Sequence, residues 1–201
     1  MNTPITVDDI IQTPSIITST VSLRNGEEVL LRPLTKDDTD LLGEYFINLS
    51  FATRDLFGPH PFDQKTADRL CDGLDPYETL RMIGISEKAG RPRVIGYFLL
   101  KFGIPDGTIE RYQGFDFELD DAKDCLIAPS VADDYQDQGL GSLLFRETIE
   151  VACRAGRRYV VLMGGVRSVN ERGIHFYKKF GFVTAGEFEN RGNNFDMYLE
   201  L

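Results

Sequence analysis

The segment from Tyr135 to Val151 has the sequence YQDQGLGSLLFRETIEV. Two glycines, Gly139 and Gly141, stand one residue apart and directly precede a run with apolar residues at helical spacing. Upstream, CLIAPSV at 125–131 is apolar and typical of a buried strand. A strand, a glycine turn and a helix start gather backbone N–H groups at the positive end of the helix dipole. The segment therefore predicts a site for a phosphate or pyrophosphate.

The glycine spacing excludes two common nucleotide-binding motifs. A dinucleotide fingerprint requires GxGxxG, whereas this loop has QxxGxG followed by Ser142 and two leucines. A Walker loop requires a lysine after its last glycine, and here a serine follows Gly141. The loop also contains the carboxylate of Asp137 and no cation. A bound phosphate therefore has to be accommodated beside a negative charge.

The composition is that of an acidic globular protein. The chain has 201 residues, with 32 acidic and 22 basic side chains and a formal net charge of −10. Nucleic acids and anionic membranes require basic faces, so neither is expected as a partner. No apolar stretch is long enough to span a bilayer, and the N-terminus lacks the features of a signal peptide. We expect a cytoplasmic protein, and the charge suits a cationic substrate.

Cysteine and histidine usage gives no sign of a metal site. Cys71, Cys125 and Cys153 are widely spaced, no CxxC pair is present, and the histidines are His60 and His175. A zinc site is therefore not expected, and reduced intracellular thiols are the predicted state. Both histidines are interpreted as structural or surface residues, and His60 is the one that could line a substrate pocket.

The N-terminal half predicts an extension, two helices and three strands. Residues 1–20 contain two Thr-Pro dipeptides and are interpreted as an extension, either a flexible arm or a segment docked on a partner subunit. The domain is assigned to 21–201. Thr35 and Asp63 are placed to cap helices. EVLLRPL, LRMIGISE and RVIGYFLLKFGI are typical of strands, and KAGRP predicts a turn between the last two. In the acidic insert that follows, 105–124, the alternation of FDFEL permits a further strand.

The C-terminal half predicts a parallel crossover and a closing hairpin. A strand at 125–131, the helix beginning near Leu140 and the continuously apolar YVVLM at 159–163 would form neighbouring parallel strands joined by a right-handed crossover. The residues from Asn170 to Lys179 have helical spacing, and GFVTAGEFE and NFDMYLEL predict an antiparallel pair. The fold class is mixed α/β.

Two motifs in this half resemble the signatures of the GCN5-related N-acetyltransferases (GNATs). VADDYQDQGLG at 131–141 is similar to V-x-P-x-Y-[RQ]-G-x-G-x-G, and NERGIHFYKKFGF at 170–182 is similar to N-x-x-[AG]-x-x-x-Y-x-K-x-GF. The resemblance is most specific over 125–182. It implies a mostly antiparallel central sheet with flanking helices, in which the fourth and fifth strands are parallel and splay apart. Here those strands would be 125–131 and 159–165.

The resemblance also implies the ligand and its contacts. Acetyl-CoA would serve as co-substrate, with its pantetheine amides bonded in the splay and its pyrophosphate on the loop amides. No metal is implied. The cofactor-binding residues that the resemblance implies are Ser130, Val131, Gln136, Asp137, Gln138, Gly139, Leu140, Gly141, Ser142, Asn170 and Tyr177.

Three departures from the family pattern concern this ligand. Asp133 stands in place of a proline and Asp137 in place of a glycine, so two carboxylates flank a site for a dianion. Pro129 lies in the strand whose N–H groups usually face the thioester, and a proline has no N–H. The donor to the thioester oxygen is therefore either Ser130 or Val131.

The reaction that the resemblance implies is direct attack of an amine on the thioester. A primary amine is protonated at pH 7, so a proton must be removed, and the leaving thiolate must be stabilised. Tyr177 matches the position where the family keeps a hydroxyl for the thiolate. Asp124 is our candidate base, and Asp116, Glu118 and a water wire are the alternatives.

The acceptor would enter through the aromatic loop at 50–62, where the family places acceptor-lining residues. Phe57, His60 and Phe62 are the predicted substrate contacts, and Phe51 lies in the same loop. The predicted function is an acetyl-CoA-dependent N-acetyltransferase for a primary amine, either a cationic small molecule or a protein amine, and a homodimer is compatible with it. The alternative is a non-catalytic acyl-CoA-binding or regulatory module of the same fold.

Overall fold

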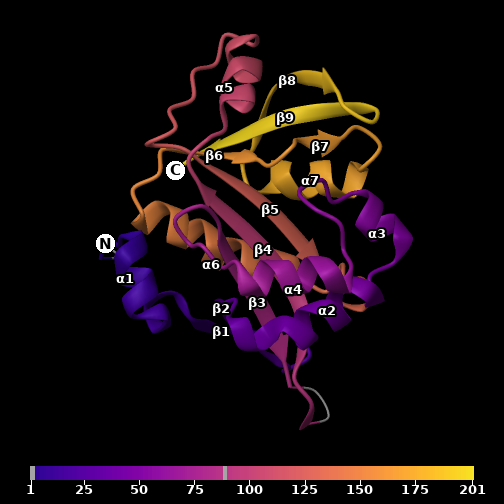
Figure 1. Ribbon diagram of the computed structural model, residues 1–201. Helices are drawn as coiled ribbons and strands as arrows, with labels where there is room; N and C mark the ends of the chain where they lie inside the picture. Colours follow the sequence, from indigo (N-terminus) through magenta and orange to yellow (C-terminus); the bar gives the residue numbers. More distant parts are fainter. Residues whose placement is uncertain (1–2, 88–89) are drawn as a thin grey trace.

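The computed structural model describes residues 3–87 and 90–201. A central sheet has the strand order β1-β2-β3-β4-β5-β6-β9-β7, with β8 paired to β9 (Figure 1). Within the described residues, β5 and β6 form the only parallel pair of neighbouring strands. This confirms the predicted mixed, mostly antiparallel fold. The strands are β1 (Ser19–Ser22), β2 (Glu28–Pro33), β3 (Leu80–Ser86), β4 (Arg93–Phe102), β5 (Cys125–Val131), β6 (Tyr159–Leu162), β7 (Val166–Arg167), β8 (Val183–Glu189) and β9 (Asn193–Glu200).

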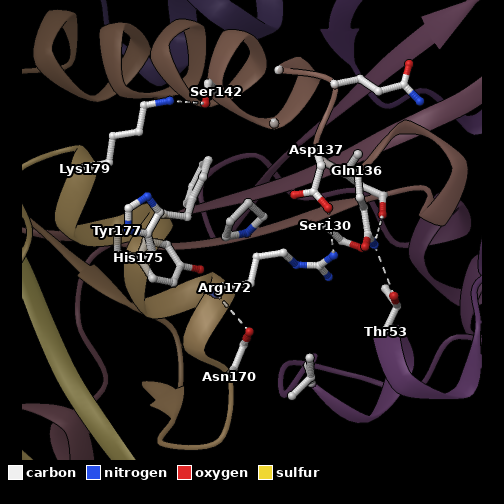
Figure 2. Close-up of a pocket in the computed structure, with 18 of the residues that line it drawn as sticks. Thr53, Ser130, Gln136, Asp137, Ser142, Asn170, Arg172, His175, Tyr177 and Lys179 are labelled. Atoms are coloured by element: carbon white, nitrogen blue, oxygen red, sulfur yellow. Dashed lines mark hydrogen bonds and ion pairs between the residues drawn. The ribbon is translucent and has the colours of Figure 1, made fainter.

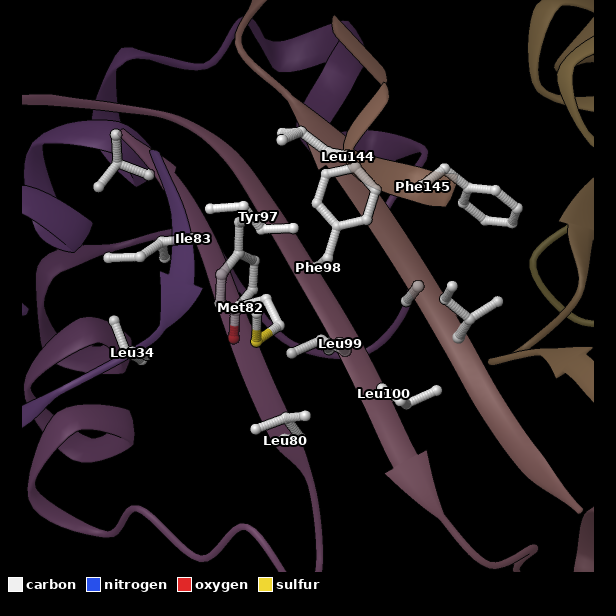
Figure 3. Packing of buried hydrophobic residues seen from close by; sticks show 14 of the residues in the cluster. Leu34, Leu80, Met82, Ile83, Tyr97, Phe98, Leu99, Leu100, Leu144 and Phe145 are labelled. Atoms are coloured by element: carbon white, nitrogen blue, oxygen red, sulfur yellow. The ribbon is translucent and has the colours of Figure 1, made fainter. Parts of the chain in front are cut away.

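Helices cover both faces of the sheet. Neighbouring residues of a strand point to opposite faces, and β4 shows which helix covers which face. Tyr97 packs on Phe46 of α2, with ring centroids 5.4 Å apart, whereas the adjacent Gly96 faces Leu144 of α6. Figure 3 shows Tyr97 and Leu144 among the packed apolar side chains. The α2 side and the α6 side therefore form separate layers of core. The helices are α1 (Val7–Gln12), α2 (Thr39–Asn48), α3 (Phe51–Asp55), α4 (Gln64–Asp72), α5 (Asp106–Gln113), α6 (Leu140–Arg154) and α7 (Glu171–Lys179).

Most predicted element starts are present, and the acidic insert is the exception. Asp63 caps α4 by accepting from the Thr66 N–H, as its position predicted. The insert forms α5 and a coil, so the strand considered for FDFEL is absent from these described residues. Phe117 packs on Tyr198 of β9, with ring centroids 4.2 Å apart. The alternating apolar side chains of this segment therefore pack against the sheet, although its backbone does not pair with a strand. Lys88 and Ala89 of the predicted KAGRP turn lie outside the described residues.

The N-terminal segment packs on its own chain. Helix α1 begins with a capping box in which Thr6 and Asp9 exchange hydrogen bonds, and Ile10 is buried. Arg154, at the end of α6, donates from Nη1 to the carbonyl of Ile16 at 2.8 Å. The sequence favoured a flexible arm or a contact with a partner subunit, whereas the described part of the segment covers the end of α6. The domain boundary itself stays a prediction.

β5 and β6 are paired over only part of their length. Their parallel register ends at Ile127 and Leu162, followed by one bond of 2.9 Å from the N–H of Met163 to the carbonyl of Ile127. β5 then continues beside β4 alone. The other strand turns away through Gly164 and Gly165, whose φ angles of +80° and +71° favour glycine, and leads into β7. The splay therefore begins directly after this pair.

The contact between α6 and the sheet can be tested at Gly96. A Cβ there would lie 2.5 Å from Cδ1 of Leu144, a fully buried side chain that also rests on Gly84 of β3. Because the core around Leu144 is filled, Gly96→Ala should lower the free energy of unfolding by about 1–3 kcal/mol in urea denaturation. The control is Gly107→Ala in α5, where an added Cβ meets nothing within 4 Å. Equal stability of both variants and the wild type would contradict this packing.

Candidate functional site

A cavity of about 660 Å³ lies where β5 and β6 separate (Figure 2). Its walls are the end of β5, the loop before α6, the first turn of α6, α7 and α3. Ten of the eleven residues predicted to contact the cofactor line this cavity. Leu140 does not, because its side chain is completely buried in the core beneath the loop. The two resembling motifs, which are far apart in sequence, therefore form one site.

The start of α6 presents unsatisfied backbone donors to the cavity. Gly139 is the N-cap residue with a φ of +88°, and no side chain caps the helix. The first N–H groups of a helix have no intrahelical partner, and the helix dipole places partial positive charge there. An added Cβ at Gly139 would meet nothing within 4 Å, so the cradle is open above the loop. Open space and free N–H groups fit an anion such as a pyrophosphate.

The backbone of β5 decides which donor faces the cavity. The N–H of Ala132 donates to the carbonyl of Ile95 in β4 at 2.9 Å. Because alternate residues direct their N–H groups to opposite neighbours, the N–H of Ser130 also faces β4. The cavity side of this strand end receives Pro129, which has no N–H, and Val131. Of the two predicted donors to a thioester oxygen, the geometry therefore favours Val131.

Asp133 and Gln136 hold the loop against α3. The carboxylate of Asp133 accepts from the Ser50 N–H at 2.7 Å and from the Thr53 hydroxyl at 2.6 Å. Burial alone would raise the pKa of Asp133, but these hydrogen bonds outweigh it and lower that pKa below its ordinary value. Gln136 donates from Nε2 to the Val131 carbonyl at 3.1 Å and to Thr53 at 3.2 Å. Asp133 was expected to flank the phosphates, and it instead anchors the start of α3.

Cations from outside the loop line the same cavity as Asp137. Its carboxylate lies 3.8 Å from Nη1 of Arg172 on α7, whose side chain extends across the cavity (Figure 2). On the opposite side, Lys179 donates from Nζ to the hydroxyl of Ser142 at 3.3 Å. Arg24, from the turn between β1 and β2, lines the same cavity. Among the described lining residues, three permanent cations therefore accompany a single carboxylate.

Helix α7 carries the polar groups of the inner wall. The side chain of Asn170 caps the helix by accepting from the Gly173 N–H at 2.9 Å. Tyr177 packs near Phe145, with ring centroids 6.3 Å apart, and directs its hydroxyl into the cavity (Figure 2). Burial raises the pKa of Tyr177 above its ordinary value, so the hydroxyl keeps its proton and can donate it. His175, interpreted from the sequence as a structural or surface residue, also lines the cavity.

The aromatic loop contributes one of its three predicted substrate contacts directly. Phe57 lines the cavity and stacks on Phe62 with ring centroids 4.5 Å apart. Phe62 is buried beneath it, and His60 bonds through Nε2 to the hydroxyl of Tyr97 at 3.2 Å. Burial lowers the pKa of His60 and favours a neutral ring. His60 and Phe62 thus support Phe57 from behind, while Phe51 is largely exposed.

Asp124 is placed for a structural role. It lies at the end of β5 opposite the cavity, is fully buried, and accepts from Arg158 at 2.8 Å and from the Tyr159 N–H at 3.1 Å. The alternatives Asp116 and Glu118 are exposed side chains of the insert and do not line the cavity either. None of the three carboxylates proposed as a base is therefore in contact with the cavity.

Several lining residues were missed by the sequence reasoning. Arg172, His175 and Lys179 stand at i, i+3 and i+7 of α7, a spacing that places them on one helical face. That spacing was available in the sequence and would have identified a basic face beside the glycine loop. Leu56 and Phe98 had no such signal, because their position depends on how α3 and β4 pack around the splay.

The described residues contain no helix long and apolar enough to cross a membrane. Nor does this part of the chain bring together three or more His, Cys, Asp or Glu side chains able to hold a metal ion. The three cysteines are unpaired, with Cys71 and Cys125 buried and Cys153 exposed.

Comparison with known proteins agrees with this geometry. Residues 104–184 match the family described as the acetyltransferase (GNAT) domain. Acetyltransferase PA5475 of Pseudomonas aeruginosa is 30% identical over 140 residues, which cover 68% of this chain and 66% of that protein. The aligned region thus spans just under two thirds of the relative's length.

Solved structures share the fold. The GNAT domain of S. lividans PAT is 21% identical with a TM-score of 0.73, over 94% of this chain and 99% of that one. The structure of yncA from Salmonella typhimurium, which contains its cofactor acetyl-CoA, is 20% identical with a TM-score of 0.60, over 86% and 94% of the two chains. These structures and this chain therefore have the same fold. Over residues 104–184 the chain belongs to the GNAT acetyltransferase domain family, and the overall fold agrees with this assignment.

The position of Arg172 opposite the loop leads to a prediction about acetyl-CoA affinity. Arg172→Gln should weaken acetyl-CoA binding about 10- to 100-fold, because one charge-assisted hydrogen bond to a phosphate contributes roughly 1.5–3 kcal/mol. Asp137→Asn should tighten binding, most clearly at low salt, where screening is weak. Calorimetric titration at low and high salt measures both effects. Arg146→Gln, an exposed arginine of α6 that does not line the cavity, serves as control. Unchanged affinity of Arg172→Gln at low salt would show that Arg172 serves Asp137 alone.

Asp124 provides a stability prediction. Asp124→Asn should lower the free energy of unfolding by up to about 3 kcal/mol, below the cost of breaking a fully buried pair, because Arg158 is partly exposed. Amine acetylation per folded molecule should not change. A general base would instead lose about 10²- to 10⁴-fold in turnover with the fold intact, and that outcome would return Asp124 to the mechanism.

Proposed function

We propose that this protein is an acetyl-CoA-dependent N-acetyltransferase that acts on a primary amine. One observation carries the proposal: the cavity joins the free N–H groups of the α6 start and the hydroxyl of Tyr177 across the gap between β5 and β6. The first group suits a pyrophosphate, and the second suits a leaving thiolate at the other end of the same extended ligand.

The position of each residue in the cavity would determine its role in binding and catalysis. When bound, acetyl-CoA supplies an activated acetyl group as a thioester. The α6 start with Arg172 and Lys179 would hold its phosphates. The N–H of Val131 would stabilise negative charge that develops on the carbonyl oxygen. Tyr177, kept protonated by burial, would donate a proton or hydrogen bond to sulfur.

The acceptor would meet an apolar wall. Leu56 and Phe57 of the α3 region, Phe98 of β4 and Pro129 of β5 line the inner part of the cavity. Asp137 is the single carboxylate among the described lining residues. The net charge of −10 still favours the approach of a protonated amine. We therefore favour an acceptor with one primary amine next to an apolar group, either in a small molecule or on a protein.

The alternative, a non-catalytic acyl-CoA-binding module, makes a different prediction for thiol release. A transferase should release free CoA from acetyl-CoA only when a suitable amine is present, whereas a binding module should be stabilised by acetyl-CoA and release none. A panel of alkyl, aryl, polyamine and peptide amines with thiol detection separates the two. The hydroxyl of Tyr177 favours the transferase, because a binding module has no use for a proton donor at the sulfur position.

Tyr177→Phe tests the catalytic assignment. The substitution keeps the ring packed beside Phe145 and removes one oxygen, so the fold should persist. Turnover should fall by about 10²- to 10⁴-fold, the range for general acid catalysis. The dissociation constant of acetyl-CoA should change little, because the contact strengthens in the transition state. Tyr198→Phe, in an aromatic cluster outside the cavity, is the control. Wild-type turnover in a folded Tyr177→Phe protein would remove this hydroxyl from the mechanism.

The cellular location and the partners of the protein are also proposals. The free thiols of Cys71, Cys125 and Cys153 support a reducing, cytoplasmic location. A homodimer and the lack of nucleic-acid or membrane partners stay predictions from the sequence.

A further inference from the structure

A second cavity of about 430 Å³ lies on the α2 side of the end of β5. It is lined by Tyr45, Asn48, Leu49, Arg93, Ala132, Asp133 and Asp134. The side chains of Asn48, Arg93 and Asp134 are exposed, so this cavity is open to solvent. Tyr45, by contrast, is 4% exposed, and its ring packs edge-on against Phe62.

One buried hydrogen bond connects the two cavities. The hydroxyl of Tyr45 lies 2.8 Å from that of Ser130, and either oxygen can be the donor. Ser130 lines the larger cavity and Tyr45 lines the second one. Both side chains are almost completely buried, Ser130 at 7% exposure. Two hydroxyls in contact between a reaction cavity and one that is open to solvent can pass a proton, since each is both donor and acceptor.

A protonated amine in the larger cavity requires a group that accepts its proton. Its single carboxylate among the described residues, Asp137, sits in the phosphate loop beside Arg172. His175, also exposed to solvent, stands on the basic face of α7 with Lys179. Asp133, the nearest carboxylate to the end of β5 in sequence, is bonded to the start of α3. A protonated amine on the α2 side of the strand therefore meets hydroxyl oxygens rather than a carboxylate.

We propose that Ser130 and Tyr45 form a proton relay that deprotonates the bound amine and releases the proton into the second cavity. The inference rests on the proposed function. The ammonium group transfers one proton to Oγ of Ser130, which passes its own hydroxyl proton to Oη of Tyr45. Tyr45 passes its hydroxyl proton to water in the second cavity, so the amine becomes neutral and neither residue changes charge. In this scheme Ser130 is the catalytic residue and Tyr45 acts through it.

The surroundings of Tyr45 favour proton transfer through its hydroxyl without formation of a phenolate. The hydroxyl of Tyr45 bonds to Ser130, and the charges of Asp133 in the loop and of Tyr97 and Arg93 in β4 act on its pKa. Burial, followed by the negative charge of Asp133, raises the pKa of Tyr45 above its ordinary value. The phenolate is therefore not populated, and a proton can leave Tyr45 only as another arrives.

The relay is tested with Tyr45→Phe, Ser130→Ala and Ser130→Thr, using acetyl-CoA and the most active amine of the panel. At pH 7 the first two variants should lose about 10²-fold in kcat, the lower end for proton-transfer catalysis. Their deficit should shrink as the pH approaches the amine pKa of about 10, because solvent then supplies neutral amine. The solvent deuterium isotope effect on kcat should change as well. Ser130→Thr keeps a hydroxyl and should restore most of the activity.

A matched control variant and a binding measurement separate a relay from a packing role. Tyr112→Phe removes a buried hydroxyl that likewise makes one hydrogen bond, to the Met197 carbonyl at 3.0 Å, outside both cavities. It should lose similar stability on melting and keep the wild-type pH profile. Calorimetry should give nearly equal acetyl-CoA affinity for Tyr45→Phe and the wild type.

Two results would overturn the relay. If Tyr45→Phe keeps the wild-type kcat and isotope effect, or loses the same factor at every pH, the pair is structural and the proposed function still stands. If the wild type binds acetyl-CoA but acetylates no amine of the panel, the proposed function fails and the relay fails with it.

Discussion

The parallel ladder between β5 and β6 ends after Ile127 and Leu162, and the cavity exists because it ends there. Two local features of the sequence prevent it from continuing. Pro129 has no N–H on the side that faces the gap. Gly164 and Gly165 adopt left-handed conformations that lead the chain away to β7. The unpaired edges that result would be a liability on a sheet surface, and here they line a cavity that a ligand with amide groups can fill.

Charge is distributed unevenly around this gap. The chain as a whole is acidic, yet the described residues at the cavity mouth include Arg24, Arg172 and Lys179 with Asp137 as the single carboxylate. Exposed ion pairs contribute at most about 1 kcal/mol, so Arg172 can exchange Asp137 for a phosphate at little cost. The acidic remainder of the surface then repels a free anionic ligand, and the local cations determine where it binds.

Much of the fold could be predicted because local signals and packing agree. The caps at Thr35 and Asp63, the strand at 125–131 and the helix at Asn170 all depend on residues close together in sequence. The strand considered for FDFEL did not form, because alternation of apolar and polar residues indicates which side chains are buried and not which backbone groups are hydrogen-bonded. The ion pair that buries Asp124 with Arg158 had no signal in the sequence, and the assignment of Asp124 as a base stays a prediction. The Tyr45–Ser130 contact joins residues 85 positions apart and leaves no pattern in the sequence.

The most direct test of this account is amide hydrogen exchange with and without acetyl-CoA. The ligand should slow exchange at residues 136–142 and at 164–167, where the free N–H groups and the diverging edge lie, and leave β1 to β3 unchanged. Such localised protection is the result that the account predicts. Bound acetyl-CoA that protects another part of the chain, and leaves these two segments exchanging as before, would contradict it.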